Sequence, residues 1–169
     1  NILIYLRNLL LNFCTNFSCM HNKVKIGLIQ MKMGTNKEKN TSKAIGLIKK
    51  AAKRGAQIVC LPELFNSLYF PQEENDKNAL KLAEQIPGPT TKRLCLLAKE
   101  LKIILIVPLF EKSGKKYFNT IAVIDEKGKI LGKYRKMHLP HDPFFFEQNY
   151  FSKGNLGFKV FKTKFGKIA

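Results

Sequence analysis

The stretch "GAQIVCLPELF" (Gly55–Phe65) decides the fold. Its apolar part, "QIVCLPE" (Gln57–Glu63), predicts a short strand that Pro62 ends. Another β-rich run, "VKIGLIQM" (Val24–Met31), precedes it, and small or apolar residues recur at helical spacing between the two. These residues are Ala44, Ile45, Leu47, Ile48, Ala51 and Ala52. A strand–helix–strand unit of this kind favours two parallel strands buried on both faces.

The segments further along the chain extend this unit. A helix is predicted near Lys77–Gln85, "PGP" at 87–89 ends it, and a second helix begins at Thr90 or Thr91. Strands follow in "IILIVPLF", "YFNTIAVID" and "KILGKYR", and "FKVFKTKFGKIA" (158–169) reads as a strand, a turn and the start of another strand. This order predicts an α/β fold with a mixed sheet.

Composition fits one globular domain and leaves the charge to be explained. The chain has 169 residues, 45% of them hydrophobic, and a formal net charge of +18. Such a charge suggests nucleic-acid binding, but only four of the 30 basic residues are arginine and the lysines are spread through every segment. We therefore interpret the charge as solvated lysine faces. A non-catalytic, basic nucleic-acid-binding module is kept as the alternative from another functional class.

The cysteines and the N-terminal stretch carry less information. Cys14, Cys19, Cys60 and Cys95 form no C-x-x-C pair or zinc spacing, so reduced thiols in the cytoplasm are expected.

Residues 1–19 are interpreted as a disordered extension outside the fold, with an amphipathic membrane helix as the alternative. Residues 20–169 then form the folded part.

Glu63 is the first candidate functional residue. In α/β folds, polar residues just past the carboxyl end of a buried strand lie where ligands bind. The apolar residues around Glu63 predict a partly desolvated carboxylate, which suits general-base chemistry. A glutamate that caps the next helix or pairs with a lysine explains its position equally well.

Three other positions are weaker candidates when each is taken alone. Lys136 follows a strand, and a lysine beside a carboxylate in a closed pocket can stabilise an oxyanion, but most lysines are solvated. Glu147 lies in "FFFEQNYF", where an exposed loop residue beside an aromatic patch is favoured. His138 and His141 have no carboxylate or cysteine at ligand spacing, so structural hydrogen bonding is expected rather than metal binding.

Together, five regions of the chain resemble the carbon–nitrogen hydrolase (nitrilase) superfamily. They run in family order from about residue 24 to the end: "KIGLIQM", "GAQIVCLPELF" with "YFPQEE", "PGPTTKRLCLLAKELKI", "YFNTIAVIDEKGKILGKYRKMHLPHDP" and "FFFEQNYFSKGNLGFKVFKTKFGKIA". The "RKMHLPHDP" and "FEQNYF" parts most resemble the N-carbamoylputrescine amidase branch, and carbamoyl-β-alanine amidohydrolases are the near alternative.

The resemblance implies an α-β-β-α sandwich and a Glu-Lys-Cys catalytic set. By position, Glu63 corresponds to the general base, Lys136 to the lysine that supports the oxyanion, and Glu147 to an additional glutamate that positions substrate and catalytic groups. It further implies hydrolysis of a small N-carbamoyl amine, N-carbamoylputrescine to putrescine, ammonia and carbon dioxide, in polyamine biosynthesis. No metal, organic cofactor, nucleic acid or membrane is implied, and a homo-oligomer is expected at full length. Lys133 and Arg135 are then background charge.

The sequence departs from the family pattern at the nucleophile. The resemblance places the catalytic cysteine a few residues beyond Ala169, and none of the four cysteines present occupies that place. Cys60 precedes Glu63 in its strand and is interpreted as a core residue. The chain is therefore expected to be the N-terminal portion of the hydrolase domain, incomplete at its C-terminus and inactive as it stands. "SKGN" (152–155) also replaces the usual "PGD"-like turn.

Overall fold

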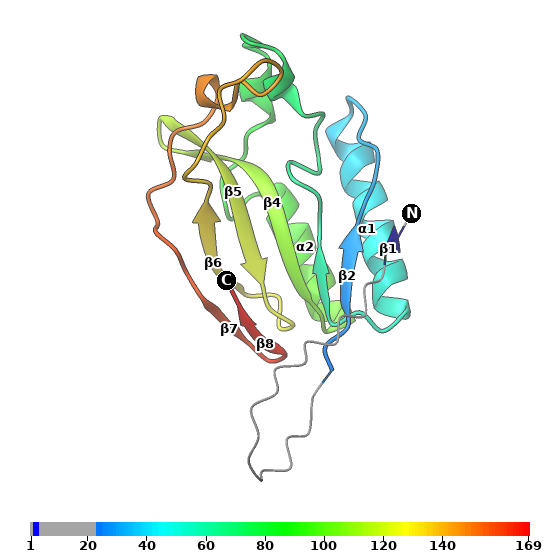
Figure 1. Cartoon of the computed structure of the whole chain (residues 1–169). Coiled ribbons are helices and arrows are strands. Elements are labelled where there is room, and N and C mark those ends of the chain that lie inside the picture. The colour runs from blue at the N-terminus through cyan, green and yellow to red at the C-terminus, as the bar shows by residue number, and fades with distance from the viewer. Residues whose placement is uncertain (1, 4–22) are drawn as a thin grey trace.

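A six-stranded mixed sheet forms the centre of the fold in the computed structural model, which describes residues 2–3 and 23–169 (Figure 1). The sheet order is β1-β2-β3-β4-β5-β6, with β2, β3 and β4 parallel to one another and the other neighbours antiparallel. The expected parallel unit and mixed sheet are confirmed. The strands are β1 (Ile2–Leu3), β2 (Ile26–Ile29), β3 (Ile58–Cys60), β4 (Ile104–Ser113), β5 (Lys116–Ile124) and β6 (Ile130–Arg135).

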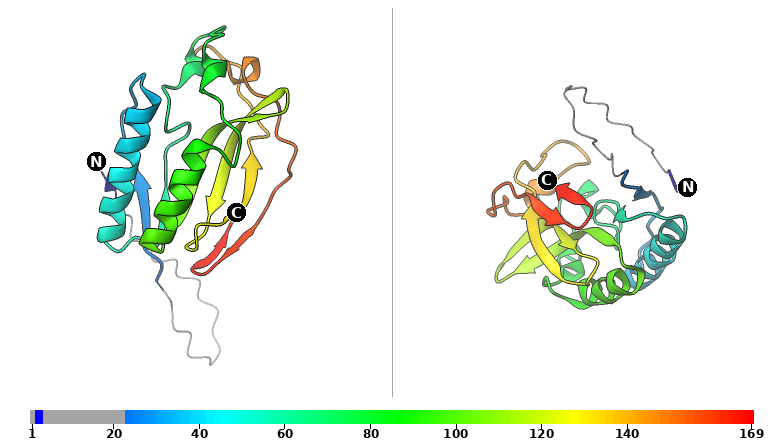
Figure 2. Two further views of the ribbon diagram at one scale, coloured as in Figure 1. Left: turned by 180° about the vertical axis from the view of Figure 1, so that it is seen from behind. Right: turned by 90° about the horizontal axis from the view of Figure 1, so that it is seen from below.

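The two α-helices among the described residues cover the same face of this sheet (Figure 2). Helix α1 (Lys37–Lys53) is preceded by Asn36, whose side chain accepts a hydrogen bond from the backbone N–H of Lys39 and so caps the helix. Helix α2 (Pro89–Leu101) has proline at its first position, where the missing N–H costs nothing. The first helix matches the sequence prediction, and the second begins one or two residues earlier than expected.

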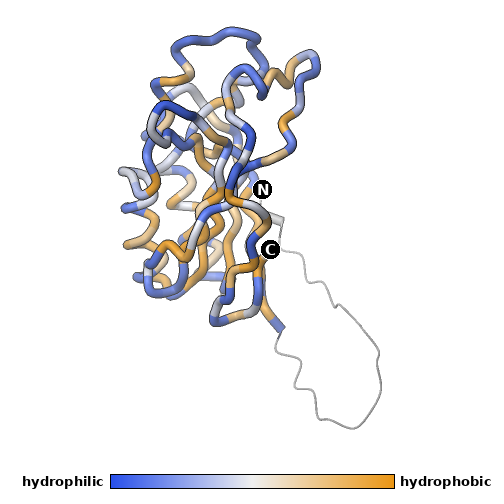
Figure 3. Tube along the Cα trace, turned by 90° about the vertical axis from the view of Figure 1, so that its left-hand side faces the viewer, coloured by the Kyte–Doolittle hydropathy of each residue, from blue (hydrophilic) through white to orange (hydrophobic). Residues whose placement is uncertain are grey.

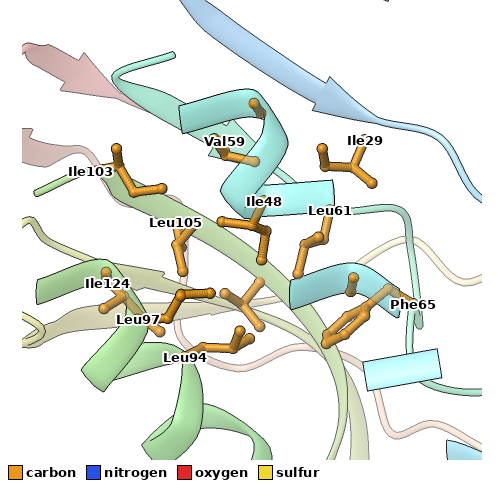
Figure 4. Close-up of a cluster of buried hydrophobic side chains, with 14 of the residues drawn as sticks. Ile29, Ile48, Val59, Leu61, Phe65, Leu94, Leu97, Ile103, Leu105 and Ile124 are labelled. Carbon is orange, nitrogen blue, oxygen red and sulfur yellow. The ribbon is translucent and has the colours of Figure 1, made fainter. Parts of the chain in front are cut away.

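The main hydrophobic core fills the space between the helices and the sheet (Figure 4). Alternate residues of the strands, among them Val59, Leu105 and Ile124, point toward the helices. There they pack in one cluster with Ile48 and Leu94. All five are almost completely buried. Because successive strand residues face opposite sides, this alternation fixes which strand residues remain for the other face.

A hairpin covers part of the face opposite the helices. Strands β7 (Phe161–Thr163) and β8 (Gly166–Ile168) form a separate two-stranded sheet. Phe161 and its neighbours pack on a second apolar cluster that includes Ile58, Ile104 and Val123. The right-hand view of Figure 2 shows the resulting order of helices, sheet and hairpin. The expected α/β class is confirmed.

The prediction of a helix near Lys77–Gln85 is wrong. Only a short 3₁₀ helix (Ala79–Leu82) forms there. The backbone of Glu84 instead pairs with β4, donating to the carbonyl of Phe110 and accepting from the N–H of Lys112. These bonds require an extended backbone at Glu84, so a tertiary contact overrides the local helical pattern.

The expected extension over residues 1–19 lies outside the described residues, apart from Ile2 and Leu3, which pair with β2. Cys14 and Cys19 also lie outside them. Across residues 2–3 and 23–169, no helix has the length and apolarity needed to span a membrane.

Loops after β3 and β6 meet at one end of the sheet. Strand β6 runs in the same direction as β3 because β4, β5 and β6 alternate, so both carboxyl ends lie at this end (Figure 1). The Phe146 N–H donates to the carbonyl of Pro71 at 2.8 Å, which joins the two loops. In Figure 3 the loops here, at the top of the view, are largely hydrophilic, whereas the strands below are largely hydrophobic.

Candidate active site

Glu63 stands in the loop that leaves β3. The N–H of Leu61 still pairs with the carbonyl of Ile106 on β4, so the strand direction is held to within two residues of Glu63. Leu64 then adopts a left-handed backbone conformation (φ 48°), which is uncommon for leucine and turns the chain sharply. The side chains of Leu64 and Phe65 enter the core, whereas that of Glu63 is 47% exposed. The half-exposed carboxylate is therefore only partly desolvated, as expected, but its apolar neighbours pack into the core rather than around it.

Lys136 is held in place by two backbone hydrogen bonds, one from its N–H and one to its carbonyl. Its N–H donates to the carbonyl of Asn119 on β5, and its carbonyl accepts from the N–H of Gly154. The loop at Gly154 runs so close to β6 that a Cβ there would lie 2.0 Å from the carbonyl oxygen of Arg135. Only glycine permits this approach.

Glu147 begins a short 3₁₀ helix (Glu147–Asn149) and is only 1% exposed. Its carbonyl accepts from the N–H groups of Tyr150 and Phe151, whose rings belong to an aromatic cluster beneath the site. The exposed loop position favoured from the residue alone is wrong. The carboxylate is buried, and polar partners on other segments compensate its burial.

These three residues meet through the ammonium group of Lys136. Its Nζ lies 2.8 Å from Oε1 of Glu147 and 3.2 Å from Oε1 of Glu63. The side-chain amide of Asn119 also donates to Glu63 Oε1, at 2.6 Å. Partial burial lowers the pKa of Lys136, but the hydrogen bond to Glu147 and the charges of both glutamates outweigh it, so that its pKa lies above the ordinary value. Lys136 is therefore a cation at neutral pH.

Tyr69 is a site residue that sequence reasoning missed. Its hydroxyl donates to Glu147 Oε1 at 2.8 Å, so one carboxylate oxygen receives two hydrogen bonds. Burial, followed by the hydrogen bond to Glu147, raises the pKa of Tyr69 and keeps it a donor. The second oxygen, Glu147 Oε2, is buried and has no partner among the described residues. A buried carboxylate oxygen in this state is an acceptor open to a donor from a ligand.

Glu111 forms a second charged cluster beside the site. Its carboxylate, 1% exposed, accepts from Arg135 through two nitrogens at 2.8 Å, from Thr120 at 2.7 Å and from Lys133. Burial alone would raise the pKa of Glu111, but these donors lower it to about 2. Lys133 and Arg135 are thus counter-ions of a buried glutamate, which corrects their interpretation as background charge. The alternation of charged residues in "KYRK" is the only sequence signal of this pairing.

The remaining candidates lie apart from these contacts. Cys60, on β3, is half-buried, and burial raises the pKa of its thiol, which disfavours the thiolate. His138 and His141 are exposed. In the part of the chain that the structure describes, no three His, Cys, Asp or Glu side chains gather as a metal site would require.

An open depression of about 780 Å³ lies beside the site. The residues next to Lys136 and Glu147 in sequence, Met137 and Gln148, are part of its wall, together with His138, Leu139, Pro140, Phe151 and Lys153. A small molecule could therefore approach the loops that carry the lysine and the buried glutamate.

Comparisons with known proteins identify relatives of the chain. A citrullinase from Francisella tularensis subsp. tularensis is 40% identical over 146 residues, which cover 86% of this chain and 51% of the relative. An N-carbamoylputrescine amidase from Solanum tuberosum is 36% identical over 145 residues, covering 86% of this chain and 48% of the relative. The crystal structure of a carbon-nitrogen hydrolase from Helicobacter pylori G27 superposes with a TM-score of 0.78 and 34% identity, covering 85% of this chain and 50% of that one.

The chain spans about half the length of the curated relatives that it matches. The sequence model of the carbon-nitrogen hydrolase family matches residues 25–169, nearly all of the described part. This match confirms the resemblance read from the five regions, and the chain belongs to the carbon-nitrogen hydrolase family.

Proposed function

We propose that the protein containing this chain hydrolyses a linear C–N bond of an N-carbamoyl amine, and that Glu63, Lys136 and Glu147 carry out the reaction with a cysteine encoded after Ala169. The observation that carries the proposal is the ammonium of Lys136 in contact with two carboxylates from distant parts of the chain. A cation fixed between two acids beside an open depression is an arrangement suited to a developing oxyanion.

In the proposed mechanism Glu63 is the general base. It takes the proton of the cysteine thiol as the sulfur attacks the carbamoyl carbon, and it passes that proton to the departing nitrogen. Lys136 stabilises the negative oxygen of the tetrahedral intermediate. Water then cleaves the resulting thioester-like acyl-enzyme, and the released carbamate loses carbon dioxide. One water is consumed in total for each amine, ammonia and carbon dioxide formed.

Glu147 is proposed to hold the substrate. Its Oε1 is occupied by Lys136 and Tyr69, while Oε2 is buried without a partner. A ureido or amide group brings N–H donors that would satisfy this oxygen, and an unmade hydrogen bond in a buried site is costly. This supports a substrate that carries N–H groups at the reacting end.

The proposed substrate is N-carbamoylputrescine. Relatives named N-carbamoylputrescine amidase and citrullinase both match over 86% of this chain, and both names refer to substrates with a terminal ureido group. Carbamoyl-β-alanine or another linear amide is the alternative substrate. The proposal includes a role in polyamine biosynthesis, in the cytoplasm, as a homo-oligomer.

The test begins with the complete reading frame of the gene. The proposal requires a cysteine encoded within a few residues after Ala169, and its absence would contradict the mechanism. The purified gene product should release ammonia and putrescine from N-carbamoylputrescine, at a higher kcat/KM than it shows for citrulline or N-carbamoyl-β-alanine. Glu63→Gln should abolish the release, whereas Glu126→Gln, in the β5–β6 turn and outside the proposed site, should leave it unchanged. Equal ammonia release by Glu63→Gln and wild type would overturn the role of Glu63.

A further inference from the structure

Asn119 touches both residues at the centre of the proposed chemistry. Its side-chain amide donates to Glu63 Oε1 at 2.6 Å, while its backbone carbonyl accepts the N–H of Lys136 at 2.9 Å. It lies within β5 and is 5% exposed, so its position is fixed by the strand pairings on either side.

The residue type at this position is unexpected for a strand. Asparagine is depleted in strands, and the neighbours in "YFNTIAVI" are mostly β-branched or aromatic. A carboxylate can only accept hydrogen bonds, so the amide nitrogen of Asn119 must face Glu63. The side chain therefore accounts for the presence of asparagine where the backbone alone would favour another residue.

The two carboxylate oxygens of Glu63 differ in their hydrogen-bond partners. Oε1 receives the amide of Asn119 and the ammonium of Lys136, whereas no described residue donates to Oε2. The Glu63 side chain is half exposed, and among the described residues only Asn119 and Lys136 form hydrogen bonds with it. One oxygen is thus anchored and the other is left open.

We infer that Asn119 is a positioning residue that anchors Glu63 through Oε1, sets its distance from Lys136, and leaves Oε2 as the oxygen that takes the proton. This inference rests on the proposed function for the role of Oε2, but the anchoring itself is a matter of structure. Asn119 is not a catalytic residue, because it acts through Glu63 and Lys136.

The experiment compares variants of the complete gene product. Asn119→Leu keeps the shape and removes the donor, Asn119→Asp removes the donor and adds a negative charge, and Asn119→Ser serves if the leucine variant does not fold. The matched control is Asn66→Asp: Asn66 is also buried and also donates to a glutamate, Glu84, outside the proposed site. Steady-state kinetics with N-carbamoylputrescine are measured across pH, and crystal structures are determined.

We expect both Asn119→Leu and Asn119→Asp to lower kcat about ten- to a hundredfold, the scale of one hydrogen bond to a charged group, with KM changed less than about threefold. Asn119→Asp should also move the acid limb of the pH–rate profile upward by about one pH unit or more, because the new carboxylate faces Glu63. In the leucine or serine variant the Glu63 carboxylate should leave hydrogen-bonding distance of Lys136. Asn66→Asp should lower the melting temperature and leave kcat and the profile unchanged.

Retention of kcat by the Asn119 variants, or a Glu63 carboxylate that stays in place without the amide, would overturn the inference. A wild-type enzyme that hydrolyses no ureido compound would overturn the proposed function instead. In that case the position of Glu63 in the variant crystal structures still decides whether Asn119 anchors it.

Discussion

The Nζ atom of Lys136 lies 2.8 Å from Oε1 of Glu147, a carboxylate that is only 1% exposed. Burying an ionised carboxylate is costly unless it is paired, and Lys136 supplies the charge that compensates it. The same ammonium reaches Glu63. The contact therefore joins the stability of the Glu147 loop to the arrangement of the proposed catalytic groups.

Lys136→Met should lose activity and stability together. Methionine keeps the length of the side chain but removes the charge that would stabilise the oxyanion, so we expect kcat to fall by at least about a hundredfold. It also leaves Glu147 with only the Tyr69 hydroxyl as a partner. Urea denaturation should show that the free energy of unfolding falls by about 3 kcal/mol. This is the low end for breaking a buried ion pair, because the lysine is partly exposed.

A double variant separates these two effects. Lys136→Met combined with Glu147→Gln removes the uncompensated charge and should recover part of the lost stability but none of the activity. Lys92→Met, on the exposed side of α2, should change neither quantity. Wild-type activity in Lys136→Met would remove the lysine from the mechanism.

Tyr69→Phe should reduce kcat about tenfold while the ring continues to pack. The variant loses one hydrogen bond to an ionised group, which contributes about 1.5–3 kcal/mol, and the remaining donor to Glu147 Oε1 is Lys136. Tyr117→Phe is the control, because Tyr117 packs on Phe110 in the same cluster and its hydroxyl bonds to no described residue. If both phenylalanine variants have the same kcat, the Tyr69 hydroxyl does not orient Glu147.

Most of the fold was predictable because its signals are local. The apolar runs of β2, β3 and β4 and the Asn36 cap each depend on residues close in sequence. The failure at 77–85 has a different cause. Glu84 pairs with Glu111 on β4, which lies far along the chain, and no local pattern predicts that contact.

Within the candidate site, Glu63 could be picked out from its position after a buried strand, whereas Lys136 and Glu147 could be picked out only through family resemblance. Taken alone, Lys136 reads as one surface lysine among many and Glu147 as an exposed loop residue, because burial of a loop carboxylate depends on which distant donors meet it. Tyr69 lies 78 residues from Glu147, and Asn119 lies 56 residues from Glu63. Such pairs become visible only when the carboxyl ends of β3 and β6 are brought together.

Glu111→Gln should weaken the fold and change how stability depends on pH. The pKa of Glu111 is about 2 in the folded chain, below its ordinary value of 4.5. Its ion pairs therefore stabilise the fold fully above about pH 4.5, and this stabilisation is lost as the pH falls toward 2. Removal of the charge leaves Arg135 and Lys133 without their partner and should cost about 3–5 kcal/mol near neutral pH.

The measurement is urea denaturation at several pH values between 2 and 6. The difference in stability between wild type and Glu111→Gln should shrink steadily as the pH falls through this window. Glu38→Gln is the control, since Glu38 pairs with Arg93 on the solvent-exposed surface and screening should make its effect small at every pH. A difference that stays constant with pH would mean that Glu111 is not the titrating partner of Arg135.

Gly154→Ala should disturb Lys136 without touching any charged group. The added methyl would lie 2.0 Å from the carbonyl oxygen of Arg135 and 2.9 Å from that of Lys136, so the backbone after β6 or the loop that crosses it must shift. Overpacking of this kind costs about 1–3 kcal/mol, and a displaced ammonium should lower kcat more than it changes KM. Gly46→Ala, on α1 with open space around it, should instead stabilise the protein by about 0.5–1 kcal/mol and leave kcat alone. The measurements are the melting temperature and kcat of both variants. Gly154→Ala should lower both quantities, whereas Gly46→Ala should raise only the melting temperature. An unchanged kcat in Gly154→Ala would show that the position of Lys136 does not depend on the close approach at Gly154.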